Sequence, residues 1–407
     1  DALRAFARVV DEHVEELARI EVQNSGHPIG SARWEAAHVG QVLNYYAGAP
    51  ERLLGAQIPV PGGIDVTFHE PYGVVGIIVP WNFPMTIASW GFAPALAAGN
   101  AVVLKPAELT PLTAIRLGEL ALEAGLPEGL FQVIVGSGSV VGQRFVSHPD
   151  VRKVVFTGST EVGTEVAAGC ARLLKPVTLE LGGKAANIVF DDAPIDQAIE
   201  GIVNGIFFNQ GHVCCAGSRL LVQESIHDEV VDRLKARLST LRMGDPLDKN
   251  TDIGAINSAA QLARIRELSD IGEAEGAERW TAECEIPEQG FWFAPTIFTG
   301  VETSHRIARE EVFGPVLSVL TFRTPQEAIA KANNTPYGLS AGIWSDKGSR
   351  ILAVADQLRA GVIWANTFNR FDPASTFGGY KESGYGREGG RQGLAAYLAP
   401  TAAAGAQ

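Results

Sequence analysis

Cysteine is scarce in this chain, and the few that occur exclude two classes of protein. Only four are present among 407 residues, at positions 170, 214, 215 and 284. This number excludes a disulfide-stapled scaffold, and the spacing contains no C-x-x-C pair that would indicate a metal site. We therefore expect no bound metal, and a reducing compartment, the cytoplasm, as the location of the protein.

Positive charge and long apolar runs are scarce too. The chain has 33 Lys and Arg against 46 Asp and Glu, a net charge of −13, which argues against a nucleic-acid partner. No apolar run approaches the roughly 20 residues of a membrane-spanning helix, and the charged segment 1–16 is unlike a signal peptide. We expect no membrane association. A hydrophobic content of 46% over this length predicts a globular protein of two or three domains.

Short apolar runs alternate with helical patterns in the first half of the chain. The alternation predicts βαβ units, and hence an α/β fold with a doubly wound, Rossmann-like parallel sheet. The predicted strands are Val74–Val79, Ala101–Leu104, Phe131–Val135, Lys153–Phe156 and Asn187–Phe190, and the predicted helices are Leu112–Ala124 and Val162–Leu173.

A second series of the same kind predicts a second α/β domain that starts near Gly182. Its strands are Arg219–Val222, Phe291–Ile297, Val316–Phe322 and Ala341–Trp344, and its helices are Ile226–Leu241, Ala259–Glu275 and Ser349–Leu358. Between residues 58 and 68 the pattern breaks, and Pro61–Gly63 predicts the turn of a protruding β-hairpin. Because an isolated hairpin is marginally stable in water, we expect it to pack against something else, such as another subunit.

The segment 207–217 is where the chain most plainly indicates chemistry. It places Cys214 and Cys215 side by side among glycines and small residues. A thiolate is a strong nucleophile that needs only modest activation, whereas a structural cysteine more often stands alone in an aliphatic run. The pattern favours a catalytic thiol, with a packed and unreactive pair as the alternative.

Polar side chains also follow the ends of predicted parallel strands, where open α/β sheets bind ligands. Asn82, held between Pro80 and Pro84, is either a fixed amide donor for an oxyanion or a simple turn former. Lys105 and Glu108 either contact a ribose or form a solvated charge pair. Each of these motifs is weak when it is taken alone.

Two glycine-containing turns and one carboxylate complete the set. The turn with Gly138 and Gly142, and the turn at 156–160, each precede a helix whose N-terminus suits a pyrophosphate, although neither is a full G-x-G-x-x-G. Glu180 lies at an apolar strand end, where burial would raise its pKa into the range of a general base. A structural ion pair is the alternative for this glutamate.

Together these motifs resemble those of the aldehyde dehydrogenase superfamily, and the resemblance covers nearly the whole chain. They follow in the family's order: PWNFP at 80–84, KPAE at 105–108, FTGSTEVG at 156–163, LELGGK at 179–184, FFNQGHVCCAGSR at 207–219, EEVFGPV at 310–316 and FGGYKESGYGRE at 377–388. The resemblance implies NAD(P)-dependent oxidation of an aldehyde to the carboxylic acid, through a thiohemiacetal and a thioester on a cysteine.

The same resemblance implies the roles of individual residues. Cys214 matches the nucleophile, Asn82 the oxyanion donor and Glu180 the base that activates water. Glu388 matches a carboxylate behind that base, and Cys215 is a bystander. Because CoA-acylating relatives lack the base, Glu180 implies that a free acid is released.

The resemblance also implies a cofactor site. The residues that it assigns to this site are Pro80, Trp81, Lys105, Pro106, Glu108, Gly138, Gly142, Phe156, Ser159, Leu181, Gly182, Glu311 and Phe313. Glu108 favours NAD over NADP because a carboxylate repels a 2′-phosphate, and use of both cofactors is left open. The implied domains are a dinucleotide-binding domain at 1–52 and 72–181, an oligomerisation hairpin at 53–71 and a catalytic domain at 182–397; whether 398–407 joins the hairpin is left open.

A substrate tunnel is implied by a set of mostly aromatic positions. They are Phe83, Ile87, Trp90, Phe208, Val213, Phe371 and Phe377. Such a lining suits aliphatic or aromatic aldehydes. Alternatively, Asp372 near the mouth attracts an ammonium group, unless the neighbouring Arg370 cancels its charge.

Three departures from the family's pattern qualify this interpretation. His212 stands where the family usually has Gln or Glu, either as a tolerated substitution or as a charge that perturbs the thiol. The usual N-terminal elements of the cofactor domain are missing. The Ala-rich end after Tyr397 is a weak strand, so a homo-oligomer is expected with the choice of dimer or tetramer open. A piece of a longer two-module protein, a non-catalytic scaffold and an esterase side activity are the alternatives.

Overall fold

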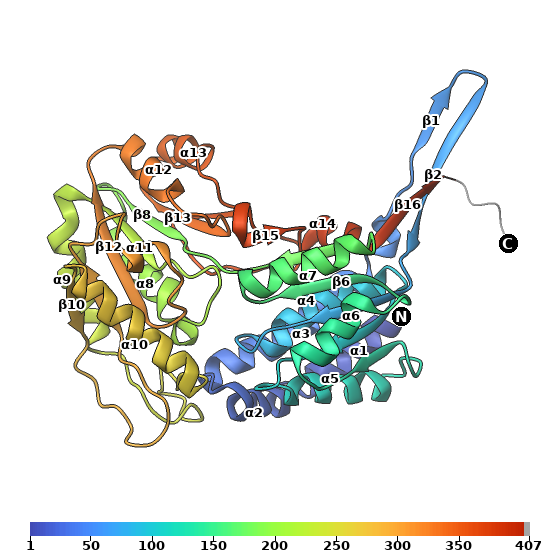
Figure 1. Cartoon of the computed structure of the whole chain (residues 1–407), viewed down its shortest axis with the longest axis horizontal. Coiled ribbons are helices and arrows are strands. Elements are labelled where there is room, and N and C mark those ends of the chain that lie inside the picture. Colours follow the sequence, from blue (N-terminus) through green and yellow to red (C-terminus); the bar gives the residue numbers. More distant parts are fainter. Residues whose placement is uncertain (403–407) are drawn as a thin grey trace.

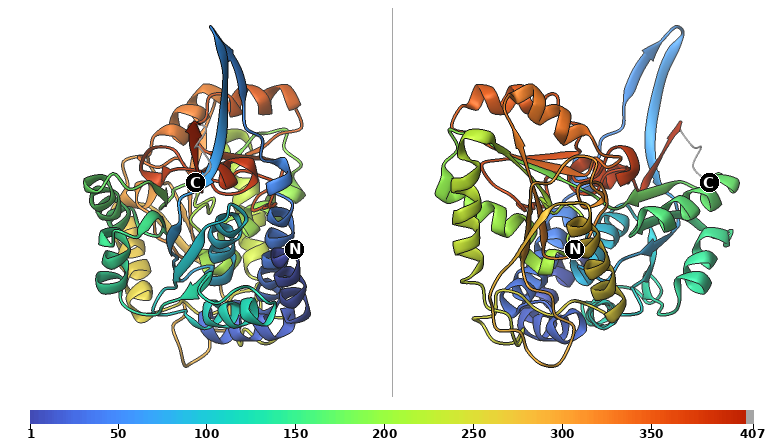
Figure 2. Two further views of the ribbon diagram at one scale, coloured as in Figure 1. Left: turned by 90° about the vertical axis from the view of Figure 1, so that its right-hand side faces the viewer. Right: turned by 60° about the vertical axis from the view of Figure 1, so that its left-hand side comes forward.

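The structure is a computed structural model that describes residues 1–402, and it consists of two α/β lobes and a projecting arm (Figure 1). The two lobes lie side by side, and the arm extends away from the lobe that contains the N-terminus. Figure 2 shows the arm standing clear of both lobes from two further directions. The predicted α/β class with parallel sheets is confirmed.

A six-stranded sheet forms the centre of the first lobe. Neighbouring strands are parallel except at one edge, where β15 runs antiparallel to β7. In sheet order the strands are β15 (Gly384–Tyr385), β7 (Val177–Glu180), β6 (Val151–Thr157), β3 (Val74–Ile78), β4 (Ala101–Lys105) and β5 (Phe131–Val133). The central strands are mostly buried, with β3 apolar throughout and β6 interrupted by Arg152 and Lys153, because helices cover both faces of a parallel sheet.

The helices of this lobe contribute chiefly to two apolar cores. Phe145, Val166 and Leu179 share the smaller core, in which α6 (Gln143–Ser147) and α7 (Thr160–Arg172) pack on the sheet. The larger core contains residues of the remaining helices, which are α1 (Ala2–Glu12), α2 (Val14–Ser25), α3 (Ile29–Ala47), α4 (Pro84–Ala97), α5 (Leu112–Glu123) and α14 (Gly390–Ala395).

A seven-stranded sheet forms the second lobe, again parallel except for one edge strand, β10. Its strands in order are β10 (Glu278–Thr281), β11 (Thr296–Thr299), β12 (Val316–Phe322), β9 (Arg219–Gln223), β8 (Ala186–Val189), β13 (Ser340–Trp344) and β14 (Val362–Ala365). Its helices are α8 (Ile195–Ile206), α9 (His227–Leu238), α10 (Ala259–Ala274), α11 (Arg306–Arg309), α12 (Pro325–Asn333) and α13 (Gly348–Ala355).

Two details differ from the sequence-based expectation for this lobe. The strand predicted at Phe291–Ile297 is wrong, because β11 begins only at Thr296, after a proline that has no N–H for a ladder. The segment 384–395 leaves the second lobe: β15 pairs with β7, and α14 contacts α4. The end of the chain therefore completes the first lobe.

The arm is a three-stranded antiparallel sheet made of β1 (Gln57–Val60), β2 (Gly63–Pro71) and β16 (Leu398–Ala402). The expectation of a weak final strand is wrong over 398–402, since β16 pairs with β2 over five residues. Backbone pairing with an existing edge outweighs the low β-propensity of alanine and proline. Positions 403–407 of the predicted element lie outside the described residues.

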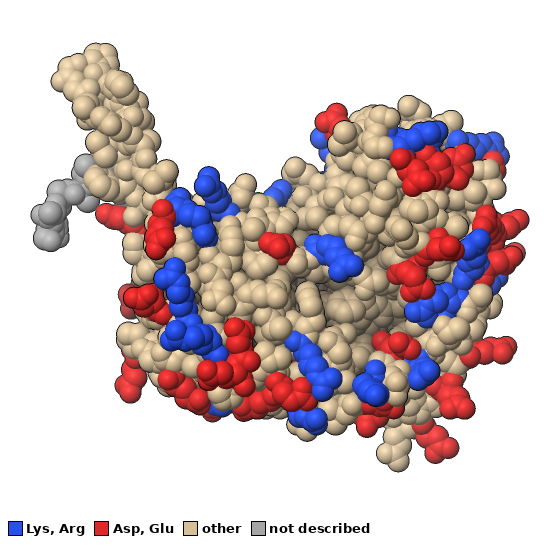
Figure 3. All heavy atoms as spheres, turned by 180° about the vertical axis from the view of Figure 1, so that it is seen from behind, with Lys and Arg blue, Asp and Glu red and all other residues tan. Residues whose placement is uncertain are grey.

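The surface of the arm is mostly apolar. The exposed hydrophobic side chains near its tip include Ile58, Val60, Ile64 and Val66. Figure 3 shows that almost no acidic or basic side chain covers the arm on the face in view, whereas both signs of charge cover the lobes. Within residues 1–402, no helix is both long enough and apolar enough to cross a bilayer.

Candidate active site

A cavity of about 260 Å³ brings together residues from both lobes. The lining contains eleven of the residues predicted from the sequence, which are Pro80, Trp81, Asn82, Ile87, Ser159, Glu180, Leu181, Gly182, Cys214, Glu311 and Phe313. Five further lining residues were not predicted: Thr157, Gly158, Gln261, Arg264 and Val312. Thr157, Gly158 and Val312 lie within motifs that the sequence already showed, whereas Gln261 and Arg264 carry no local signal.

Cys214 and Cys215 have different environments despite being neighbours. Cys214 follows the 3₁₀ turn Phe208–Gly211, is partly exposed and lines the cavity. A hydrogen bond with Cys215, reinforced by burial, raises the pKa of the Cys214 thiol well above 9.0. Cys215 is buried, and its sulfur lies 3.7 Å from the Asn369 Oδ1. The resting nucleophile is therefore a thiol that has to lose its proton to react.

Hydrogen bonds hold both the side chain and the backbone of Asn82. It follows β3 and is buried, and its Nδ2 donates to the backbone oxygen of His212 at 2.8 Å. Its own backbone oxygen accepts from Asn209 Nδ2 at 2.7 Å. Asn209 holds this position in a left-handed conformation, with φ 48°. The amide is thus built into the same loop that carries Cys214.

Glu180 ends β7 as a buried carboxyl with two oxygens that lack a hydrogen-bond partner among the described residues. Burial, followed by repulsion from Glu388 and Cys214, raises its pKa well above 4.5. Glu388 is buried as well, and burial raises its pKa to about 8. Lys153 is the cation that counters Glu388, and its own pKa falls to about 8 because of burial.

Three rings close one wall of the cavity region. Trp81, His212 and Phe313 contact one another with ring centroids 4.8 to 5.8 Å apart. Burial, and then the charge of His27, lower the pKa of His212 to about 3. His212 is consequently neutral at physiological pH, which removes the predicted possibility that its charge perturbs the thiol.

Glu311 links the two lobes at the cavity. Its Oε1 accepts from the Gly183 N–H at 3.0 Å, and burial raises its pKa to about 7. Phe313 has a left-handed φ of 55°, and Gln261 donates to its backbone oxygen at 2.9 Å. These contacts explain why Gln261 belongs to the site although no motif around it in the sequence indicates a functional residue.

The remaining predicted cofactor residues lie outside this cavity. Lys105 is buried at the end of β4, and its Nζ donates to the backbone oxygen of Pro106 at 2.9 Å. Glu108 is exposed and accepts from the Gly138 N–H at 3.2 Å, so two separate motifs do meet. Gly142 and Phe156 are buried in the sheet–helix packing of this lobe.

The predicted tunnel residues are not gathered around one open cavity. Trp90, Phe371 and Phe377 contact one another and line a small separate void of about 20 Å³. Phe83 stacks on Phe208 at 5.9 Å. Ile87 lies in the central cavity, Val213 is buried behind it, and Asp372 and Arg370 both border the small void.

Trp34 and His38 on α3 complete this aromatic group, and neither was predicted from the sequence. Trp34 contacts both Phe208 and Phe371, with centroids 6.3 Å apart in each case. Trp90 donates from Nε1 to His38 Nε2 at 3.1 Å. The aromatic positions thus form one continuous contact network from Phe83 to Phe377. Among the described residues, the rings contact one another around no single open channel, so the substrate tunnel stays a prediction.

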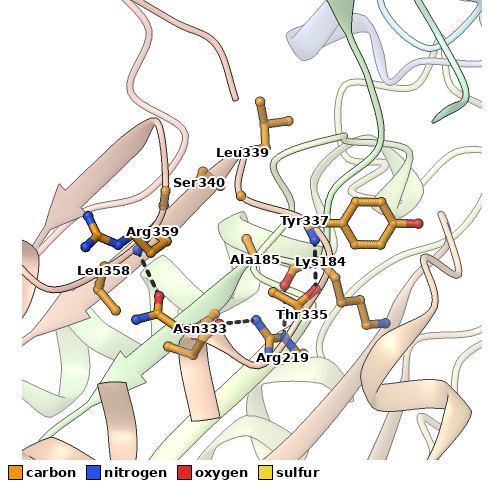
Figure 4. Close-up of a pocket in the computed structure, with 15 residues that line it drawn as sticks. Lys184, Ala185, Arg219, Asn333, Thr335, Tyr337, Leu339, Ser340, Leu358 and Arg359 are labelled. Atoms are coloured by element: carbon orange, nitrogen blue, oxygen red, sulfur yellow. Dashed lines mark hydrogen bonds between the residues drawn. The ribbon is translucent and has the colours of Figure 1, made fainter. Parts of the chain in front are cut away.

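A further small cavity, of about 20 Å³, is a packing feature of the second lobe (Figure 4). Arg219 at the start of β9 donates to the backbone oxygens of Lys184, Lys331 and Ala332 at 2.8 to 2.9 Å. Burial lowers the pKa of Lys184 to about 7. Arg219 therefore ties the loop after β7 to the end of α12, which supports the floor of the active site.

Comparison with known proteins decides the family. The model of the aldehyde dehydrogenase family matches residues 1–402. The chain belongs to the aldehyde dehydrogenase family. An aldehyde dehydrogenase of Enchytraeus buchholzi is 43% identical over 396 residues, which are 97% of this chain and 80% of the relative.

Two further relatives place the chain within the family. The cytosolic 10-formyltetrahydrofolate dehydrogenase of Xenopus tropicalis is 42% identical over 97% of this chain, and the chain spans only 45% of that protein. The crystal structure of an NAD-dependent aldehyde dehydrogenase from Sinorhizobium meliloti superposes with a TM-score of 0.97 at 43% identity, covering 99% of this chain and 80% of that one.

Proposed function

We propose that this aldehyde dehydrogenase oxidises an aldehyde to the free carboxylic acid with NAD, using Cys214 as the nucleophile. The observation that carries the proposal is that Cys214, Glu180 and Asn82, from three separate segments, line one cavity. A thiol, a base and an oxyanion donor around one space are what acyl chemistry at a carbonyl requires.

The first half of the reaction is thiol addition. Because the Cys214 pKa is raised, its proton must pass to a base before the sulfur attacks the carbonyl carbon. Glu180 is a carboxyl group on the same cavity, and we assign it as this base. The Asn82 amide and the Cys214 backbone N–H are the donors that we assign to the developing oxyanion.

The second half is hydrolysis of the thioester. We assign Glu180 as the base that removes a proton from water, which needs the ionised carboxylate. Glu388 raises the Glu180 pKa and lies behind it, next to Lys153. Protons that leave Glu180 therefore have a second buried carboxyl group with a raised pKa, Glu388, behind it.

NAD, when bound, supplies the hydride acceptor for the oxidation. Residues of the structure fit the cofactor: Glu311 and Phe313 border the cavity beside Cys214, and Glu108 meets the open backbone of Gly138. Around Gly138 a Cβ would meet no atom within 4 Å, which leaves space for a ligand. Lys105 and Glu108 are assigned to the ribose, and the Glu108 carboxylate disfavours a 2′-phosphate.

The aromatic network favours apolar aldehydes as substrates, by burial of apolar area. Asp372 and Arg370 border the same void, so their charges oppose each other and give no net preference for a cationic substrate. We further propose a homo-oligomer that forms through the apolar arm, and a reducing compartment such as the cytoplasm, where the four free thiols persist.

The test is an aldehyde panel with NAD and with NADP, followed at 340 nm. We expect NADH formation from aliphatic or aromatic aldehydes and a lower kcat/KM with NADP. If the protein hydrolyses activated esters but forms no NADH from any aldehyde, the dehydrogenase proposal is wrong and the esterase alternative is supported. Calorimetry that shows no NAD binding, together with no turnover of either substrate, would support a scaffold instead.

A further inference from the structure

Three buried ionisable side chains lie together behind the proposed oxyanion site. They are Glu21 on α2, His27 in the loop between α2 and α3, and Glu35 on α3, with exposed fractions of 0%, 2% and 0%. One ligand-type atom from each lies within 4.8 Å of the other two. Neither carboxylate oxygen of Glu21 has a hydrogen-bond partner among the described residues.

His27 uses both sides of its ring. Its Nδ1 lies 2.6 Å from Glu35 Oε1. The ring packs against the ring of Phe83, with centroids 5.7 Å apart, and the backbone of the neighbouring Asn82 contributes to raising the pKa of His27 as an acceptor for the protonated ring. A carboxylate and a carbonyl oxygen are both acceptors, so the ring that satisfies both is the doubly protonated imidazolium.

The same three residues are a conceivable set of metal ligands, but the distances favour the hydrogen-bonded form. Ligand atoms about 2.1 Å from one ion at ordinary coordination angles are about 3 Å or more apart. The 2.6 Å between Nδ1 and Oε1 is instead the length of a short charge-assisted hydrogen bond.

We propose that His27, held as an imidazolium by Glu35, is a positioning residue that fixes the Asn82 amide where it receives the oxyanion. The proposal rests on the proposed role of Asn82. Asn209 Nδ2 donates to the Asn82 backbone oxygen, and Nδ2 of Asn82 donates to the His212 oxygen. His27 packs against the adjoining Phe83 and interacts with the Asn82 backbone. Rotation of this peptide would move the amide relative to Cys214, two residues after His212.

The surrounding charges are consistent with a cationic His27. Burial alone lowers its pKa, but attraction to Glu35 and Glu21 and the bond with Glu35 leave the pKa above 6.5. Burial and then repulsion by Glu35 raise the pKa of Glu21 to about 7. His212 is kept neutral by burial and by the His27 charge.

The experiment is a double-mutant cycle on the full chain. We expect His27→Gln to lower kcat by roughly tenfold, because small errors in the position of a catalytic group are costly, while NAD affinity stays unchanged. In the Asn82→Ala background, His27→Gln should cause no further loss, since its effect passes through Asn82. His13→Gln, a histidine at the α1–α2 junction that binds the Val9 backbone oxygen, is the matched control.

Two more variants keep the test decisive if His27→Gln fails to fold. His27→Lys keeps a cationic donor and should restore most of kcat, whereas Glu35→Gln should lower kcat as His27→Gln does. Every variant is also assayed for ester hydrolysis, which uses the same oxyanion donors. If the wild type turns over esters but no aldehyde, the proposed function fails and the His27 cycle is still measured.

The proposal would be overturned by equal losses from His27→Gln in the wild-type and Asn82→Ala backgrounds, which indicate a general structural role. An unchanged kcat for His27→Gln would also overturn it. A third contrary result is one equivalent of metal per chain by elemental analysis, with activity lost on chelation and restored by that metal.

Discussion

At the scale of single residues, the two cysteines are the sharpest contrast in the molecule. Cys214 is partly exposed to the central cavity, and Cys215 is buried beside Asn369. We expect Cys214→Ser to abolish aldehyde oxidation and leave NAD binding intact, as measured by NADH formation and calorimetry. Cys215→Ala should lower kcat by less than about threefold, because it only removes a packed sulfur. Equal losses of activity from both variants would contradict the assignment of Cys214, rather than Cys215, as the nucleophile.

The buried carboxyl pair predicts a pH dependence. The pKa of Glu180 is raised, so the carboxyl is protonated and inactive as a base at lower pH. Steady-state kcat should therefore rise with pH as the Glu180–Glu388 pair ionises, near the Glu388 value of about 8. Glu180→Gln should flatten this rise and lower kcat by roughly 10²–10⁴. Stopped-flow detection of NADH measures both effects, and an unchanged pH profile in Glu180→Gln would exclude the role.

At the scale of elements, the turn after β7 depends on a glycine. A Cβ on Gly183 would collide with the Cys214 backbone oxygen. We expect Gly183→Ala to lower kcat at least tenfold and to destabilise the fold by about 1–3 kcal/mol, because the close approach of two backbones is lost. Gly348→Ala, at the start of α13 with no atom within 4 Å of its Cβ, is the control and should stabilise by up to about 1 kcal/mol. Urea unfolding and kcat measurements on the two variants decide the point.

The strands were largely predictable because buried parallel strands are continuous apolar runs. Helix α4 was not predicted: it is apolar on every side, so it lacks the amphipathic pattern that marks a surface helix. The segment of β16 was predicted to be a weak strand from the low β-propensity of its residues. Propensity describes single residues, whereas the pairing with β2 is what makes this segment a strand. Local patterns carry no information about such distant partners.

The candidate site shows the same division. Motif residues at strand ends, such as Asn82 and Glu180, were identifiable because the ends of parallel strands meet at one edge of a sheet. Gln261 and His27 were not, because each acts on a backbone atom far away in the sequence. The neutral state of His212 also needed the structure, since its pKa is lowered by burial and then by the charge of His27, and neither is visible in the sequence.

At the scale of the whole molecule, the arm predicts assembly. Its exposed side chains Val60 and Ile64 offer apolar area that a monomer would leave in water. We expect the wild type to sediment as a dimer or tetramer, and Val60→Lys with Ile64→Lys to sediment as a smaller species. Leu352→Lys, at an even more exposed apolar side chain on α13, is the control and should leave the mass unchanged. A wild-type monomer in sedimentation velocity would contradict the prediction.

Segment 384–395 returns to the first lobe, so the edge of that lobe's sheet at β7 is covered only after this segment has been synthesised. Until β15 and Glu388 have left the ribosome, β7 is an open sheet edge, and Glu180 has no carboxyl neighbour. Open strand edges pair readily with other chains. A nascent chain that stops before residue 384 thus lacks both the carboxyl neighbour of Glu180 and the strand that covers the β7 edge, and is prone to aggregation.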